Sequence, residues 1–260
     1  MLVSTDLQAD ALLAELQDLA ALPVEAGERP PLAADGGTPS GRQLYLVDKA
    51  GAAQSSLRIG HPAIPYDALG DFYQAGLANF PLGGVFNSRL NLKLREARGY
   101  TYGVRSAFTG GPELGSFGVS SEVNRDATAA AVSETLQVLE AYAAEGMSEP
   151  EFDFLRNAIG QRDALRYETP FNKLELLTDI LQYDLPLDYR NRQNQLLRTV
   201  DRESLNAVIA RQLRPDTLSI VVVGDLASIR PGLEALGLPI RLLDEDGFER
   251  PGKADSEDSP

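Results

Sequence analysis

Two stretches of alternating residues constrain the fold of this chain more than any other feature. Thr101–Thr109 and Gly115–Val123 each alternate apolar residues with polar or small ones, and the segment between them, Gly110-Gly-Pro-Glu113, is typical of a turn. Alternation with a period of two places one face of a strand against a core. The pattern therefore predicts an antiparallel hairpin that buries one of its faces.

Other strands and helices are predicted on both sides of this hairpin. The expected strands lie at residues 43–48 and 53–59, joined by a turn at 49–52, and at residues 218–223 and 240–243. The expected helices lie at residues 66–80, from Asn87 or Ser88 past Leu94, from Asp126 past Tyr142, from Ser148 to Tyr167, and at residues 171–183, 187–198, 201–212 and 226–236. Hairpins followed by a block of helices favour an α+β domain whose largely antiparallel sheet is covered on one face by helices.

Local signals add finer predictions. Thr5-Asp6-Leu7-Gln8 and Ser148-Glu-Pro-Glu151 both have the form of a capping box, which is expected to start a helix. The strand at 218–223 is apolar almost throughout, so both of its faces are expected to be buried. His61 precedes Pro62 at the end of a strand, so it is expected in an exposed turn.

Composition divides the chain into three parts. Residues 1–41 are expected to form a helix at 6–22, ended by Pro23, and then a linker rich in proline and glycine. Residues 42–244 are expected to form the folded domain. Residues 245–260 are expected to form an acidic tail.

The two ends of the folded chain share a weak pattern. Val3-Ser-Thr-Asp-Leu7 precedes a leucine-rich helix that ends at Pro23, and Val223-Gly-Asp-Leu226 precedes a similar segment that ends at Pro239. The separations from aspartate to proline are 17 and 14 residues, and chance similarity of two amphipathic helices explains the match equally well. A true repeat would make residues 1–23 the end of a preceding copy of the same domain.

Charge is concentrated at the ends of the chain. Of the formal net charge of −14, residues 1–40 carry −6 and residues 244–260 carry −5, which leaves −3 for the 203 residues between them. Because no basic surface is available for phosphate groups, nucleic-acid binding is not expected. No apolar stretch approaches the ~18 residues of a membrane span, and residues 1–10 lack a secretory signal, so we expect a soluble chain in a compartment that the sequence leaves open.

The histidine and cysteine content excludes most metal chemistry on this chain alone. His61 is the only histidine and there is no cysteine, whereas a zinc hydrolase site usually combines several imidazoles with a carboxylate. The chain also lacks a Gly-x-Ser-x-Gly sequence and the glycine-rich phosphate loops. We therefore expect no metal or other cofactor on this chain, and no catalytic residue that works without a partner.

The segment 81–104 has a more distinctive sequence, PLGGVFNSRLNLKLREARGYTYGV. It resembles the signature of the C-terminal, non-catalytic domain of the insulinase/pitrilysin (M16) zinc peptidases, which is also seen in mitochondrial processing peptidase. The likeness continues in residues 44–55 (LYLVDKAGAAQS), 183–189 (YDLPLDY) and 213–225 (LRPDTLSIVVVGD). It extends over residues 42–244.

The resemblance implies a specific role. In that family two similar α+β halves, on one chain or on two, enclose an unfolded peptide, and the first half carries a His-x-x-Glu-His zinc motif. The second half supplies an arginine and a tyrosine, seven residues apart, that reach the substrate, and here this spacing falls on Arg95 and Tyr102. Because the metal motif is absent, the resemblance implies the substrate-binding half of a zinc metallopeptidase, with zinc on a partner domain or subunit.

Other interpretations of the same residues remain open. Arg95 could belong to a solvated basic helix face with Arg89, Arg98 and Glu96, while Tyr102 packs in the sheet. Arg98 and Tyr100 lie beside the pair but do not have its spacing.

The chain as a whole also has alternatives. It could be a proteolytically silent scaffold, as in the core subunits of respiratory complex III, which resemble this fold. It could instead be a peptide-binding module that uses a sheet edge. A scaffold has no need of Arg95 and Tyr102, so the presence of both favours the peptidase assembly. Peptide specificity, oligomeric state and the covalent link to a partner are not predicted.

Overall fold

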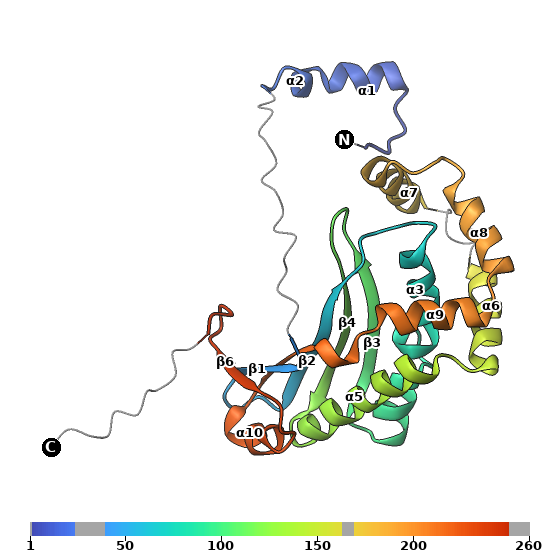
Figure 1. Cartoon of the computed structure of the whole chain (residues 1–260). Coiled ribbons are helices and arrows are strands. Elements are labelled where there is room, and N and C mark those ends of the chain that lie inside the picture. The colour runs from blue at the N-terminus through green and yellow to red at the C-terminus, as the bar shows by residue number, and fades with distance from the viewer. Residues whose placement is uncertain (1, 24–39, 163–168, 250–260) are drawn as a thin grey trace.

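A six-stranded sheet and a layer of helices make up the body of the molecule (Figure 1). The computed structural model describes residues 2–23, 40–162 and 169–249. The strands are β1 (Gln43–Asp48), β2 (Gln54–Ala63), β3 (Thr101–Gly110), β4 (Gly115–Asn124), β5 (Ser219–Gly224) and β6 (Ile240–Leu243). The α-helices are α1 (Ala9–Glu15), α2 (Gln17–Ala20), α3 (Asp71–Asn79), α4 (Arg89–Asn91), α5 (Thr128–Glu145), α6 (Glu149–Arg162), α7 (Pro170–Tyr183), α8 (Tyr189–Thr199), α9 (Arg202–Gln212) and α10 (Leu226–Glu234). Two π-helical turns, η1 (Phe80–Gly84) and η2 (Leu92–Ala97), and two 3-10 turns, η3 (Arg125–Ala127) and η5 (Pro215–Thr217), complete the described elements.

The sheet has the strand order β3-β4-β2-β5-β1-β6. The pairs β3–β4, β4–β2 and β2–β5 are antiparallel, whereas β1 is parallel to both of its neighbours, β5 and β6. Strand β5, helix α10 and strand β6 thus form a crossover unit, as parallel strands require. The expected α+β fold with a largely antiparallel sheet is confirmed, and the predicted hairpin is β3–β4.

Strands β1 and β2 do not pair with each other, so the hairpin expected around residues 49–52 is wrong. Strand β5 lies between them, with Val222 opposite both Leu46 of β1 and Leu57 of β2. Apolar burial favours this arrangement, because β5 is the most apolar strand and gains most in the interior of the sheet. A local turn cannot reveal a partner that lies far away in the sequence.

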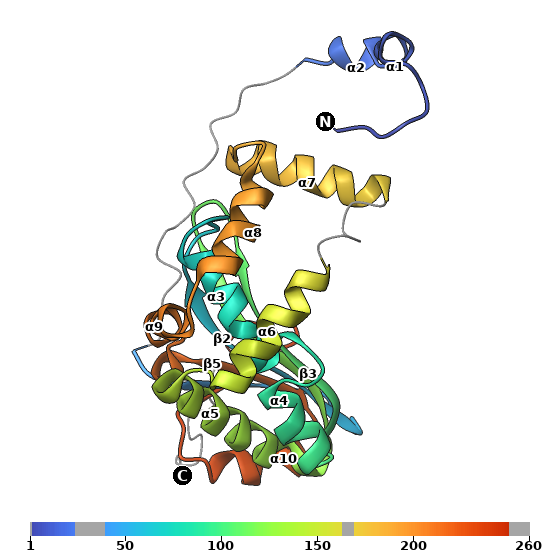
Figure 2. The same ribbon diagram turned by 90° about the vertical axis from the view of Figure 1, so that its right-hand side faces the viewer.

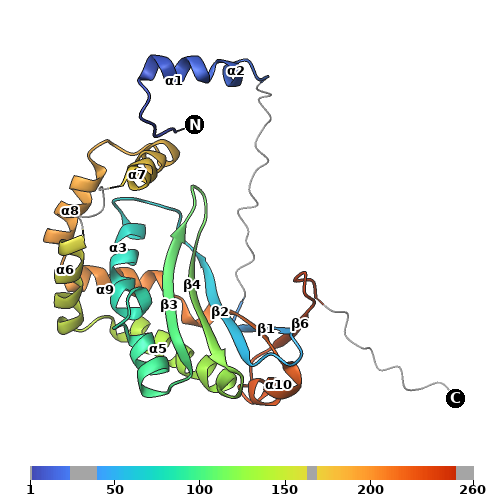
Figure 3. The ribbon, with the colours of Figure 1, turned by 180° about the vertical axis from the view of Figure 1, so that it is seen from behind.

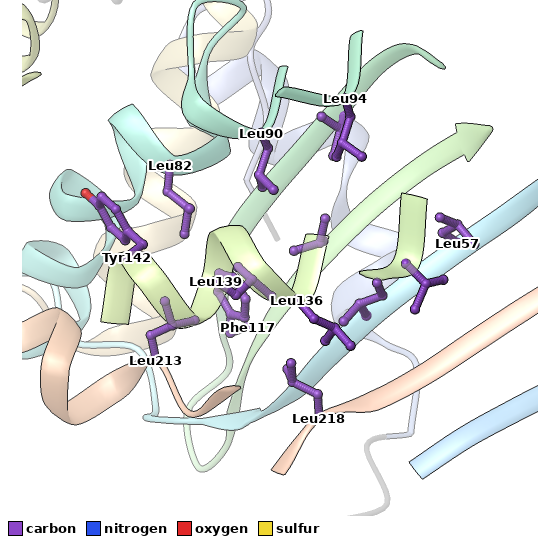
Figure 4. Close-up of a cluster of buried hydrophobic side chains, with 14 of the residues drawn as sticks. Leu57, Leu82, Leu90, Leu94, Phe117, Leu136, Leu139, Tyr142, Leu213 and Leu218 are labelled. Carbon is purple, nitrogen blue, oxygen red and sulfur yellow. The ribbon is translucent and has the colours of Figure 1, made fainter. Parts of the chain in front are cut away.

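Helices cover one face of the sheet, as Figure 2 shows from the helical side. In Figure 4, Leu136, Leu139 and Tyr142 of α5 belong to the same cluster of buried side chains as Leu57 and Phe117 of the sheet. The long helix predicted past Tyr142 therefore supplies the centre of the core. None of the helices in the described ranges is long and apolar enough to span a membrane.

The opposite face of the sheet is exposed along β3 and β4; in Figure 3 the helices α3, α6 and α9 lie to the left of these two strands. On β4 the residues alternate strictly between buried and exposed, and Ser116, Gly118, Ser120 and Glu122 are on the exposed side. In β5 the alternate residues are only partly exposed. The prediction that both faces of β5 are buried is therefore wrong, because only one face has helices packed against it.

The two capping boxes expected from the sequence differ in outcome. Ser148 and Glu151 form one half of the expected capping box, since the Ser148 N–H donates to the Glu151 carboxylate at 2.7 Å while the Ser148 hydroxyl donates to the same carboxylate at 2.8 Å. At the N-terminus the expected box does not form, because the Thr5 hydroxyl accepts the N–H of Leu7 and α1 begins only at Ala9. The helix expected at 6–22 is also broken into α1 and α2.

Between α3 and β3 the chain contains π-helical turns where the sequence predicts α-helix or a break. The helix expected at 66–80 begins at Asp71, because the Asp67 carboxylate holds the N–H groups of Leu69 and Gly70 in a turn, each at 2.9 Å. The backbone then continues past Pro81 as the wide turn η1. After Ser88, α4 and η2 together form the second helix and bring the chain to β3.

Candidate functional site

The turn at Gly99 places Arg95 and Tyr102 on adjoining elements. Arg95 lies in η2, and Tyr102 is the second residue of β3. Gly99 has a φ of 65°, a left-handed conformation that ends a helix and reverses the chain at low cost when no Cβ is present. Both side chains line one pocket of 280 Å³, together with Glu96, Thr101 and Asn124.

An irregularity in β3 turns Tyr102 out of the sheet. Thr101 is opposite Val123 and Val104 is opposite Ser121, so three steps on β3 match two on β4. This is the pattern of a β-bulge, which re-aims a side chain. Tyr102 is consequently 89% exposed, so the interpretation that Tyr102 packs in the sheet is wrong.

Two hydroxyl groups hold the bulge in place. The Thr101 hydroxyl accepts the N–H of Gly103 at 3.1 Å and the hydroxyl of Ser121 at 3.0 Å. It donates to the carbonyl oxygen of Glu122 at 2.6 Å. The polar groups that the missing ladder bonds leave at the bulge are thereby satisfied.

The Arg95 guanidinium lies between an aromatic ring and a carboxylate. Its central carbon is 3.9 Å from the centre of the Phe86 ring, within the range of a cation–π interaction, and it forms an ion pair with Glu96. The Phe86 side chain is 60% exposed and lines a second, larger pocket that also includes Tyr102. Arg95 and Tyr102 therefore lie where two pockets of the exposed sheet face meet.

The neighbouring residues Arg98 and Tyr100 have structural contacts instead. Arg98 donates to Glu134 of α5 in an ion pair of 2.6 Å, and Lys93 pairs with the same carboxylate at 2.7 Å. The hydrogen bond from Lys93 and the charge of Arg98 lower the pKa of Glu134. The Tyr100 side chain packs against the core.

Arg89 is not part of a solvated basic face, so that interpretation of the helix is wrong. Its guanidinium donates twice to the Glu151 carboxylate, at 2.6 and 2.7 Å, and once to the carbonyl oxygen of Gly146 at 3.0 Å. It also lies 4.8 Å from the centre of the Tyr142 ring. Burial opposes ionisation of Glu151, but hydrogen bonds from Arg89 and Ser148 outweigh it and lower the pKa of this carboxyl. Arg89 thus joins α4 to the start of α6.

His61 is buried within β2, so its expected position in an exposed turn is wrong. Strand β2 continues through Pro62 because it pairs with the start of β4, and the imidazole stacks on Phe117 with ring centres 5.4 Å apart. Its Nδ1 contacts the Pro62 carbonyl oxygen at 2.8 Å, and its Nε2 accepts the Arg214 N–H at 3.2 Å. Burial lowers the pKa of His61, the Pro62 bond opposes this shift, and the charge of Arg214 adds to it. The imidazole is therefore a neutral structural group.

The described residues of this chain do not fit a zinc site. Across the described ranges, no group of three histidine, cysteine, aspartate or glutamate side chains is arranged to hold a metal ion. The one imidazole has both nitrogens engaged by the protein. Zinc chemistry therefore cannot be assigned to these residues.

The outer edge of β3 is closed by two buried asparagines. The Asn91 side chain accepts the N–H of Val104 at 3.0 Å and donates to its carbonyl oxygen at 2.8 Å. Asn79 donates to the carbonyl oxygen of Ser106 at 2.7 Å. These amides occupy the groups that an added strand would use, which argues against a peptide-binding module at this part of the sheet edge.

Sequence reasoning missed three residues beside the pair. Arg58 of β2, Arg105 of β3 and Phe86 line the larger pocket of 700 Å³. The sequence contained one signal for Phe86, which is that it lies within the distinctive segment at residues 81–104. The two arginines come together only through strand register, which no local motif encodes.

A family model described as the peptidase M16 inactive domain matches residues 5–159. Among curated proteins, the chain is 22% identical over 174 residues to "Non-peptidase homolog YmxG" of Helicobacter pylori (strain ATCC 700392 / 26695). This alignment covers 66% of the chain and 40% of the relative.

Two solved structures have a similar fold. One is a peptidase M16 inactive domain from Pseudomonas fluorescens, with a TM-score of 0.67 and 26% identity, which covers 84% of this chain and 51% of that one. The other is a protease from Helicobacter pylori, with a TM-score of 0.71 and 15% identity, which covers 84% of this chain and 53% of that one. The chain thus spans about half the length of these relatives. Because the family model matches more than half of the sequence, the chain belongs to the peptidase M16 inactive-domain family.

Proposed function

We propose that this chain is the substrate-binding, non-catalytic half of an M16 zinc metallopeptidase assembly. A zinc-bearing M16 N-terminal domain or subunit faces it, and an unfolded peptide lies between the two. The observation that supports this proposal best is the pocket shared by Arg95 and Tyr102, with Tyr102 89% exposed.

Arg95 and Tyr102 act on the bound peptide as hydrogen-bond donors. A guanidinium and a phenol have donors suited to a carbonyl oxygen on which negative charge develops. One well-placed donor of this kind contributes ~2.7–4 kcal/mol to the transition state in other acyl-transfer sites. In the structure the Arg95 guanidinium is paired with Glu96. The peptide therefore either displaces the Glu96 carboxylate or binds the guanidinium N–H groups that Glu96 leaves free.

The N-terminal segment belongs to a preceding copy of the domain in this proposal. Helix α1 buries none of its residues, and Leu7, Leu13 and Leu19 are exposed around it. Helix α10 follows a similar Asp-Leu pair and buries Ile229 and Leu233. The exposed leucines of residues 1–23 therefore pack on the sheet of a preceding domain in the same way, and residues 42–244 form the second domain.

Reconstitution tests the proposed function. The chain is mixed with a His-x-x-Glu-His M16 domain from the same organism, and cleavage of an unfolded fluorogenic peptide is followed. We expect a complex by size-exclusion chromatography and cleavage by the mixture, with no cleavage by this chain alone. A zinc domain that neither associates with this chain nor depends on it for activity would contradict the proposal.

A proteolytically silent scaffold is the second candidate. The curated relative is named a non-peptidase homolog, and this chain lacks the metal motif. In that case the chain still associates with a similar domain, but the complex cleaves nothing. The same reconstitution separates the two functions through activity rather than association.

A further inference from the structure

A row of residues crosses the exposed face of the sheet beside the proposed site. Ser120 of β4 is directly opposite Arg58 of β2 on one side and Arg105 of β3 on the other. All three side chains line the pocket of 700 Å³ that also includes Tyr102. Neighbouring strands lie ~4.8 Å apart, so the Cα atoms of the two arginines are about 10 Å apart, with only a serine between them.

The charges around this pocket do not balance. Glu122 is the only acidic residue in its lining, and it is held by Arg58 at 3.3 Å and by the Ser56 hydroxyl at 2.8 Å. Arg105 is exposed, and within the described part of the chain its guanidinium has no ion-pair or hydrogen-bond partner. A cation is thus left unpaired in a hollow of a chain whose net charge is −14.

We infer that this pocket binds a carboxylate of the substrate peptide through Arg105, assisted by Arg58 and the Ser120 hydroxyl. The inference rests on the proposed function, because it places the peptide across the same exposed face as Arg95 and Tyr102. An arginine fork matches a carboxylate in two parallel hydrogen bonds, and the small serine leaves room for it. The carboxylate comes from an aspartate or glutamate side chain or from the peptide C-terminus. The assembly therefore prefers acidic peptides or carboxyl-terminal segments.

Binding to the full chain tests this specificity. Three nine-residue peptides of the same Ala/Ser/Leu sequence are titrated and followed by NMR of the backbone amides. The first is blocked at both ends, the second is blocked and has a central glutamate, and the third has a free C-terminal carboxylate. The variants are Arg105→Gln and Glu122→Gln, and Arg198→Gln is the control, because Arg198 is an exposed arginine of α8 that does not line this pocket.

At least one carboxylate peptide is expected to bind about fivefold tighter than the blocked neutral peptide, the gain of one well-placed ion pair. Arg105→Gln should abolish this preference, Glu122→Gln should increase it by releasing Arg58, and Arg198→Gln should leave it unchanged. The second and third peptides identify the source of the carboxylate.

Two different failures are distinguishable. Equal affinities for all three peptides, or a preference that survives Arg105→Gln, would overturn the specificity while peptide binding itself stands. If no peptide shifts the amide signals of β3 and β4, this inference is wrong, and the reconstitution with a zinc-bearing domain decides the proposed function separately.

Discussion

Tyr102 is exposed because the backbone of β3 departs from its ladder with β4 where this residue lies. The resemblance to the M16 non-catalytic domain singled out Arg95 and Tyr102, and in the structure both residues line one pocket. The bulge itself was not predictable, because it depends on hydroxyl contacts between Thr101 and Ser121 across two strands. The family resemblance thus identified the residues, and tertiary hydrogen bonds determine the exposure of Tyr102.

His61 should make folding sensitive to mild acid. Burial lowers its pKa from the ordinary value of 6.5, so the neutral form stabilises the fold above that pH. This stabilisation is lost as the pH falls from 6.5 through the lowered pKa, because the unfolded chain then binds a proton that the folded chain excludes.

Urea unfolding of the wild type and of His61→Gln between pH 5 and pH 7.5 measures this effect. His61 is the only histidine, so no other side chain ordinarily titrates in the middle of this range. The free energy of unfolding of the wild type should fall toward pH 5 more steeply than that of the variant. Parallel pH profiles would contradict the assignment of His61 as a buried neutral group.

At the level of elements, strands and helices with a clear period were predictable. Strands β3 and β4 and helices α8 and α9 lie within two residues of their predicted bounds, because alternation and helical spacing are local. The pairing of β1 was not predictable, since it depends on β5, which follows more than 170 residues later. The candidate site likewise depends on pairing between strands, because its larger pocket is lined by residues of β2, β3 and β4 that strand register brings together.

The closed edge of β3 gives a prediction at this scale. Asn91→Ala removes the side-chain amide that accepts the Val104 N–H and donates to the Val104 carbonyl oxygen. Val104 itself is buried. Leaving such groups unpaired costs ~1–3 kcal/mol each, so the free energy of unfolding should fall by about 2 kcal/mol or more.

Chemical denaturation measures this loss, and light scattering reports any association through the opened edge. Asn87→Ala is the matched control, because Asn87 is exposed four residues earlier and makes no hydrogen bond within the described residues. If both variants unfold at the same urea concentration, the Asn91 amide does not protect the edge.

For the molecule as a whole, the folded domain is expected to begin at Arg42. Its guanidinium donates to the carbonyl oxygen of Pro215 at 2.7 Å, whereas helix α1 buries no residue. A chain of residues 42–260 should therefore unfold cooperatively, with a stability within about 0.5 kcal/mol of the full chain.

Calorimetry of this truncation checks the boundary. A second truncation that starts at Gly51 serves as the control, because it removes β1 from between β5 and β6 and should not fold. Loss of the cooperative transition on removal of residues 1–41 would show that α1 and α2 stabilise this domain.

The central claim is that this half of the assembly acts on the peptide through Arg95 and Tyr102. The most direct measurement is kcat/KM of the reconstituted enzyme with Tyr102→Phe, which removes one hydroxyl from an exposed ring and leaves the core intact. Arg95→Ala is measured beside it, with Tyr100→Phe and Arg192→Ala as controls, since Arg192 is an exposed, ion-paired residue of α8.

The account predicts that Tyr102→Phe and Arg95→Ala each lower kcat/KM about 100- to 1000-fold, while association with the zinc-bearing partner and both control variants stay near the wild type. An active assembly that is indifferent to both Tyr102→Phe and Arg95→Ala would contradict it.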